Sequence, residues 1–191
     1  METNKEDKQI CRAKIAPSTD PEYDFECIAV PAENGQLKYS YREEEYFMQI
    51  LKVGENNVDR SRLESGLPLF DNHPYDASAA NILGISVGHE FTERGLVVRC
   101  KLGARADEAL RADIKNGIIK TVSIEGSIEN YSVERKAGEV PKYYAELWTP
   151  ESLSFAPVPN DIAAQIEVKR AIQKQISPEK ENKYKQLINK F

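Results

Sequence analysis

Long hydrophobic runs are missing from this chain of 191 residues. The longest apolar stretches, such as residues 96–98 and 117–119, are far shorter than the ~18 residues that a transmembrane helix needs. Residues 1–8 are polar and contain no apolar segment of the kind found in secretory signals. We therefore expect neither insertion into a membrane nor export.

Cysteine and histidine are scarce. The chain has three cysteines (Cys11, Cys27 and Cys100) and two histidines (His73 and His89), with no Cys-x-x-Cys pair. A structural zinc site needs several such ligands at characteristic spacings, so we expect no metal and no organic cofactor. The simplest interpretation of the cysteines is that they are buried or inert thiols in a reducing cytoplasm.

Basic residues are also in deficit. The chain has 26 Lys and Arg against 31 Asp and Glu, a net charge of −5. Nucleic-acid binding requires a basic face, so we expect no nucleic-acid partner. With 40% hydrophobic and 30% charged residues, the composition is typical of a soluble globular protein whose length suits one domain with terminal extensions.

Short segments rich in β-branched and aromatic residues predict strands. Residues 23–30 and 37–42 flank the dipeptide Asn34-Gly35, which predicts a hairpin. Residues 46–53 predict another strand, with a helix over residues 43–51 as the alternative. Further strands are predicted over residues 82–91 and 96–102 (a second hairpin), 119–123, 127–134, 142–147 and 153–155.

One amphipathic helix is predicted over residues 105–116, because Ala106, Leu110 and Ile114 recur every fourth residue. Within it, Asp107 is spaced to pair with Arg111. Gly117 stands where a helix commonly ends. A single helical turn is predicted over residues 58–63, before Gly66.

Strands with one central helix indicate an α+β protein with a mostly antiparallel, barrel-like core and flanking helices. We divide the chain into residues 1–21, a leader or short first strand, and residues 22–168, the main domain. Residues 169–191 are interpreted as a linker and an exposed helical tail that could dock on a partner. A short helix is also predicted over residues 161–173.

His73 is the more interesting histidine. An apolar approach, Leu67-Pro68-Leu69-Phe70, leads into the polar turn Asp71-Asn72-His73-Pro74-Tyr75-Asp76. This context would hold an imidazole at the edge of a core, beside carboxylates that could raise its pKa or fix its tautomer. The alternative is a loop histidine that caps a turn, and His89 has the plain interpretation of a strand histidine.

Ser123 interrupts a β-branched strand just before Glu125 and Gly126. A serine there could be a nucleophile on a rigid element, or it could simply bond a neighbouring carbonyl group. A second segment, residues 146–161, brings together the single tryptophan, three carboxylates and two serines. By themselves, the tryptophan could simply anchor the core, and the polar residues could belong to a solvent-exposed bend.

Taken in order, these segments resemble the prohead (capsid-maturation) serine proteases of tailed bacteriophages, including those encoded in front of, or fused to, a major capsid protein. The resemblance covers residues 22–168 and identifies them as a protease domain. Four motifs carry it: Arg62-Leu63-x-x-Gly66-x-Pro68-Leu69-Phe70-Asp71-Asn72-His73; Ile82-Leu83-Gly84 with Gly95-Leu96-x-x-Arg99; Ile114-x-x-Gly117-Ile118-x-x-x-Val122-Ser123-Ile124; and Trp148-Thr149-Pro150 with Leu153-Ser154-Phe155-x-x-Val158-Pro159-x-Asp161.

The resemblance implies a serine endopeptidase in which Ser123 is the nucleophile, His73 the general base and Glu151 the acid that orients the imidazole. The chain departs from the family pattern at two positions. Glu125 stands where the family usually has glycine two residues after the nucleophile. Ser152 stands where the family usually has glutamate, with glutamate displaced by one position to Glu151. Other candidates for the third catalytic residue are Asp71, His89 and Glu146.

The resemblance further implies a herpesvirus-assemblin-like fold and no cofactor. Its substrates would be segments of the scaffold and of the major capsid protein, and the chain itself, cleaved in the host cytoplasm inside the assembling prohead. The sequence leaves undecided whether the chain forms a homo-oligomer. One alternative is a catalytically weak or inactive homologue that acts as a capsid assembly or scaffolding protein. Another is a small β-rich adaptor or ligand-binding module, in which His73 and Ser123 would lie far apart.

Overall fold

The computed structural model describes residues 11–72 and 78–155 of the chain. His73 therefore lies outside the described residues. So do the helix predicted over residues 161–173 and the tail predicted over residues 169–191.

Strands dominate the described residues, as the sequence predicts. They are β1 (Cys11–Pro17), β2 (Phe25–Pro31), β3 (Gln36–Ser40), β4 (Glu45–Leu51), β5 (Pro68–Asp71), β6 (Ile82–Thr92), β7 (Gly95–Leu102), β8 (Thr121–Glu134) and β9 (Lys142–Phe155). The helices are α1 (Ser61–Ser65), α2 (Glu108–Lys115) and the 3₁₀ turn η1 (Ala79–Asn81). The expected α+β class is confirmed, with the strands in a large mixed sheet.

The chain divides into two compact units. The described part of the large unit comprises residues 11–34, 51–72, 78–131 and 145–155, and that of the small unit comprises residues 35–50 and 132–144. Strands β8 and β9 each contribute to both units.

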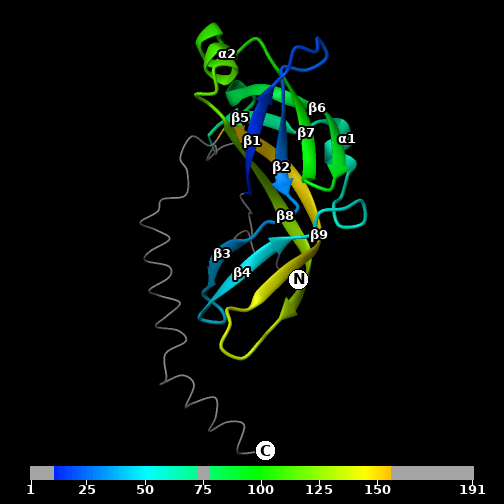
Figure 1. The fold of residues 1–191 in the computed structure, drawn as a ribbon, viewed down its shortest axis with the longest axis vertical. Helices are drawn as coiled ribbons and strands as arrows, with labels where there is room; N and C mark the ends of the chain where they lie inside the picture. Colours follow the sequence, from blue (N-terminus) through cyan, green and yellow to red (C-terminus); the bar gives the residue numbers. More distant parts are fainter. Residues whose placement is uncertain (1–10, 73–77, 156–191) are drawn as a thin grey trace, which may run out of the picture. The chain divides into compact units, whose positions relative to one another are not determined.

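In the large unit the hydrogen-bonded order of strands is β9-β5-β6-β7-β2-β1-β8, and β8 also pairs with β9 (Figure 1). The β5–β9 pair is parallel. Strand β1 pairs with β8 only through residues 11–14 and with β2 only through residues 15–17. Strand β1 thus changes its pairing partner along its length, and the sheet is not closed into a barrel, so in this respect the expected barrel-like core is corrected.

The hydrophobic core lies in the large unit. The rings of Phe25 on β2 and Phe155 on β9 have centroids 5.8 Å apart. Trp148 is 1% exposed, and its Nε1 donates a 3.0 Å hydrogen bond to the Lys52 carbonyl oxygen, so the indole is buried without losing its polar partner. Each of the two α-helices adds one buried side chain, Leu63 from α1 and Ile114 from α2.

Two of the three cysteines are buried in this core. Cys27 on β2 and Cys100 on β7 are both free thiols. A hydrogen bond with the Cys100 thiol, together with burial, raises the pKa of Cys27 well above its usual value. The thiolate is the reactive form, so the interpretation of Cys27 as an inert thiol fits its surroundings.

Helix α2 begins later than predicted, after its N-cap Asp107. The Asp107 side chain accepts a 2.8 Å hydrogen bond from the Leu110 amide, which satisfies one of the free N–H groups of the first turn. The predicted Asp107–Arg111 pair is therefore wrong: Arg111 instead forms a 3.0 Å ion pair with Asp24. Gly117 has φ 70°, as expected for a residue that ends a helix.

The hairpin predicted around Asn34-Gly35 is also wrong, although both of its strands exist. Strand β2 pairs with β1 and β7, whereas β3 pairs with β4. A two-residue turn of type I′ needs positive φ at both central residues, and neither Asn34 nor Gly35 has it. The Asn34 side chain instead bonds the backbone, accepting from the Leu51 amide and donating to the carbonyl oxygens of Leu51 and Pro31.

Within the described residues, the other predicted elements are present, with shifted ends. The second hairpin forms from β6 and β7, and α1 ends at Gly66, which has φ 95°. Residues 45–51 form a strand and not the alternative helix. Strands β8 and β9 are each continuous where two shorter strands are predicted.

The small unit contains most of the β3–β4 hairpin, the last residues of β8 (132–134), the first residues of β9 (142–144) and the turn that joins these two strands. Arg135 and Glu45 form a 2.6 Å ion pair. The rings of Phe47 and Tyr143 have centroids 4.5 Å apart. Aromatic and ionic contacts between side chains thus connect β4 with the turn region of β8 and β9.

Candidate functional site

Ser123 lies near the start of β8, where its Cα pairs with that of Arg12 on β1. The Ser123 side chain is completely buried, and its Oγ has no hydrogen-bond partner among the described residues. Burying a hydroxyl group without a partner costs free energy, and such groups are uncommon in folded proteins. An unpaired hydroxyl on a central strand therefore marks Ser123 as unusual, but full burial counts against a nucleophile that is open to substrate.

Glu125 and Ser152 join β8 to β9. The Ser152 Oγ donates to Oε2 of Glu125 at 3.3 Å, a long and partly buried hydrogen bond. Because side chains two residues apart in a strand point to the same face, Ser123 and Ser154 share the orientation of this contacting pair. Ser154 is also completely buried, and no described residue bonds its Oγ.

We call Ser123, Glu125, Ser152 and Ser154 the serine cluster. The residues that alternate with them on the two strands, Val122, Ile124, Leu153 and Phe155, all belong to the hydrophobic core. The alternation of polar and apolar residues in both strands thus sends one set of side chains into the core and the other set to the opposite face. This pattern is the signal in the sequence that could have grouped Glu125 with the serines.

Gly126 allows β8 and β9 to approach each other. A Cβ at this position would overlap the Thr149 carbonyl oxygen and lie 3.2 Å from Cα of Pro150. A side chain there would therefore push β9 away. The glycine next to the serine cluster has a packing role that the sequence alone did not reveal.

Glu151, the predicted acid, is partly buried on β9 between Pro150 and Ser152. Among the described residues, its carboxylate has no hydrogen bond or ion pair. Neighbouring side chains in a strand point to opposite faces, so Glu151 does not share the face of the serine cluster. Its predicted partner His73 lies outside the described residues.

The three other candidates for the third catalytic residue are all among the described residues. Asp71 ends β5 as an exposed residue whose Cα pairs with that of Phe155. The His89 ring lies on β6 against the ring of Phe91, with centroids 5.9 Å apart. Glu146 forms a 2.6 Å ion pair with Lys52. These described contacts are all made with residues outside the serine cluster.

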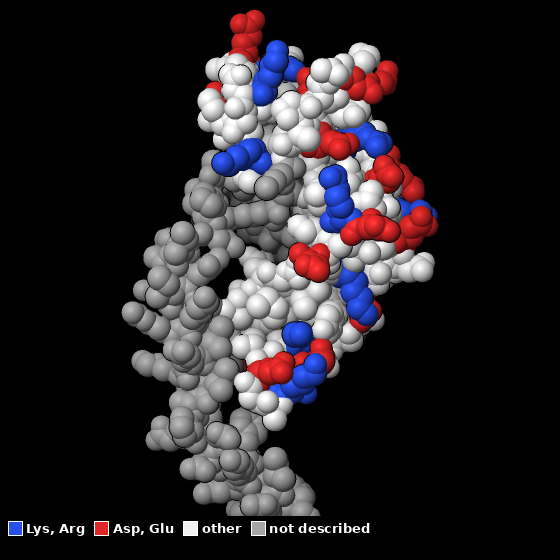
Figure 2. Space-filling view, in the orientation of Figure 1, with Lys and Arg blue, Asp and Glu red and all other residues white. Residues whose placement is uncertain are grey.

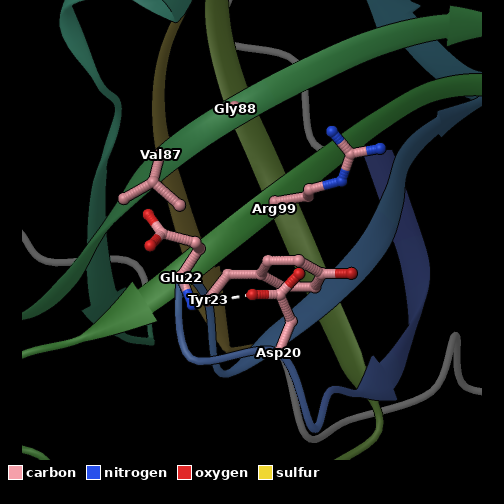
Figure 3. Close-up of a pocket in the computed structure, with 6 residues that line it drawn as sticks. All are labelled: Asp20, Glu22, Tyr23, Val87, Gly88 and Arg99. Atoms are coloured by element: carbon pink, nitrogen blue, oxygen red, sulfur yellow. Dashed lines mark hydrogen bonds between the residues drawn. The ribbon is translucent and has the colours of Figure 1, made fainter.

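A separate pocket of about 400 Å³ opens on the surface of the large unit (Figure 3). It is lined by Asp20, Glu22, Tyr23, Val87, Gly88 and Arg99. The Asp20 carboxylate accepts a 2.8 Å hydrogen bond from the Glu22 amide, and the Arg99 guanidinium lies 5.8 Å from the centre of the Tyr23 ring. Among the described residues, those proposed from the sequence for catalysis do not line this pocket.

Groups of three or more metal-binding side chains are not found in the part of the chain that the structure describes. Within the same residues, no helix is both long and apolar enough to cross a membrane. On the face shown in Figure 2, acidic and basic side chains of the described residues are interspersed, without a continuous basic surface. Comparison with protein-family models, with curated proteins and with solved structures finds no match.

Proposed function

We propose that this chain is a serine endopeptidase of the prohead type, with Ser123 as its nucleophile. The observation that carries the proposal is the unpaired Ser123 hydroxyl on a strand whose alternate side chains are fixed in the core. A rigid element holds a nucleophile at a defined position. The order of motifs along the chain supports the family, its herpesvirus-assemblin-like fold and its substrates, which are scaffold and capsid-protein segments and the chain itself.

The proposed reaction follows the chemistry of serine proteases. The Ser123 Oγ attacks the carbonyl carbon of the scissile peptide while the His73 imidazole takes its proton. The carbon–nitrogen bond then breaks, the imidazolium returns the proton to the leaving amine, and water releases the acyl group from Ser123 by the reverse sequence. A carboxylate that orients the imidazole completes the arrangement, and Glu151 is the residue that the sequence predicts for it.

A reagent that forms a covalent bond with activated serines tests this proposal. Because Ser123 is fully buried, the reagent reaches it only when neighbouring side chains move aside. We expect a fluorophosphonate to label the wild-type protein at Ser123, as mapped by mass spectrometry, and S123A and H73A to remain unlabelled. Ser127, exposed on the same strand, is the matched control, so S127A should be labelled like the wild type.

Proteolysis is measured in parallel by incubating each variant with the capsid or scaffold protein encoded beside it. Cleavage by the wild type that disappears in S123A with circular dichroism unchanged supports the enzyme. Equal cleavage by the wild type and S123A would remove Ser123 from the reaction.

The second candidate function is a catalytically silent assembly protein of the same family. Two observations favour it: Ser123 is fully buried, and serine stands at position 152 where the family usually has glutamate. In that case the wild type would bind the capsid or scaffold protein, but neither cleave it nor react with the fluorophosphonate.

A further inference from the structure

Glu125 is the carboxylate that the structure places in the serine cluster. It lies on the same strand as Ser123, two residues along, and it is partly buried. Its Oε2 accepts the hydrogen bond from Ser152 on the neighbouring strand. By contrast, Glu151 is adjacent to Ser152 in sequence and therefore points to the other face of β9.

A serine nucleophile needs a general base, and the base needs a carboxylate to hold its orientation and to support its charge. The backbone between Ser123 and Glu125 is anchored by the buried side chain of Ile124, which is 1% exposed. This anchoring keeps the carboxylate at a constant offset from the hydroxyl. The Ser152 hydroxyl group further restricts the rotation of the Glu125 side chain.

We propose that Glu125, and not Glu151, is the positioning carboxylate of the site at Ser123. The inference rests on the proposed function. In this arrangement β8 supplies both the nucleophile and the acid, and β9 supplies Ser152 as the hydroxyl that holds the acid. The two departures from the family pattern, glutamate at position 125 and serine at position 152, then belong to one contact.

The test compares E125Q with E129Q in the full chain. Glu129 is a matched control because it lies on the same strand and accepts a hydrogen bond from a β9 hydroxyl, that of Thr149. We expect E125Q to lower the rate of fluorophosphonate labelling at Ser123 by roughly 10⁴-fold, the loss seen when the orienting carboxylate of a serine-protease triad is replaced by its amide. We expect E129Q to be labelled at the wild-type rate.

The pH dependence of labelling separates a positioning role from a structural one. A carboxylate beside an imidazole favours the protonated ring and so raises the pKa of the imidazole. We therefore expect the midpoint of the labelling rate against pH to move to lower pH in E125Q. E125D, which keeps the charge, should recover part of the rate and the wild-type midpoint.

Each other outcome overturns the proposal in a recognisable way. Wild-type labelling of E125Q, or a loss carried by E151Q instead, removes Glu125 while Ser123 stands as the nucleophile. If E125Q and E125D lose the same labelling rate, melt at a lower temperature and keep the wild-type pH midpoint of labelling, Glu125 has a structural role only. Absence of Ser123 labelling in the wild type removes the proposed function together with this inference.

Discussion

Gly126 illustrates how a single residue controls the contact between two strands. Any side chain at this position would meet the backbone of Thr149 and Pro150, which cannot move without shifting β9. We expect Gly126→Ala to lower the free energy of unfolding by about 1–3 kcal/mol, the usual cost of overpacking. Urea denaturation, followed by circular dichroism, measures the change.

Gly88 on β6 is the matched control for this substitution. The nearest atom to a Cβ at Gly88 is Nη1 of Arg99, 3.9 Å away, so alanine fits without strain. Gly88→Ala should therefore change the free energy of unfolding by no more than about 0.5 kcal/mol. Equal destabilisation by both substitutions would show that close approach to β9 is not what Gly126 provides.

The serine cluster also shows, at the same scale, where sequence patterns lose information. A serine in an apolar strand is compatible with a nucleophile and with a core hydroxyl, and the sequence alone left both open. The structure adds that the Ser123 and Ser154 hydroxyl groups are buried without partners. It also pairs Glu125 with Ser152, two residues 27 positions apart in the chain.

At the scale of elements, helix α1 depends on the carboxylate that precedes it. Oδ1 of Asp59 accepts a 2.9 Å hydrogen bond from the Ser61 amide. This backbone bond, followed by a bond with the Ser61 side chain, lowers the pKa of Asp59 below its ordinary value of 3.8. The ionised form of Asp59 is therefore favoured by folding.

The sign of the pH dependence follows from this shift. Asp59 contributes stability above its unfolded-state pKa of about 3.8, and this contribution is lost as the pH falls through the lower pKa of the folded protein. Asp59→Asn keeps an acceptor for the Ser61 amide but cannot titrate. We expect the wild type to lose more stability than Asp59→Asn between neutral pH and pH values below the folded-state pKa.

Melting temperatures of both proteins across this pH range provide the measurement. Curves that stay parallel down to acid pH would mean that the Asp59 charge makes no net contribution to folding. Charges elsewhere titrate in both proteins, so the comparison isolates Asp59.

The elements differ in how well the sequence predicted them. The β6–β7 hairpin and the end of α2 at Gly117 follow from residues close together in the chain, and both were predicted. The pairing of β3 with β4 in place of β2 was missed, because Asn34 bonds Leu51 instead of forming a tight turn. Likewise, Arg111 pairs with Asp24, a residue 87 positions away, and not with Asp107.

At the scale of the whole molecule, the buried apolar residues are unevenly shared between the two units. All members of the hydrophobic core cluster belong to the large unit. In the described part of the small unit, the buried apolar side chains are those of Phe47 and Pro141. Regions with few buried contacts open locally at lower free energy than core strands.

We therefore expect amides of β3 and β4 to exchange hydrogen with solvent faster than those of β2 and β7. Hydrogen–deuterium exchange, followed by mass spectrometry of peptides that cover residues 36–50 and residues 25–31 and 95–102, measures the difference. Equal protection of the two groups would show that the small unit opens only with global unfolding.

Local properties of this protein were determined by the sequence itself. Alternating polar and apolar residues specify the strands, spacing of four specifies α2, and the α+β class follows from their order. Only the tertiary structure decided which strands pair, that the sheet is not closed, and that Glu125 meets Ser152. The physical reason is that periodicity and turn geometry act between residues a few positions apart. Strand pairing and side-chain contacts depend instead on which distant segments bury the most apolar surface together, and many pairings are compatible with the same local pattern.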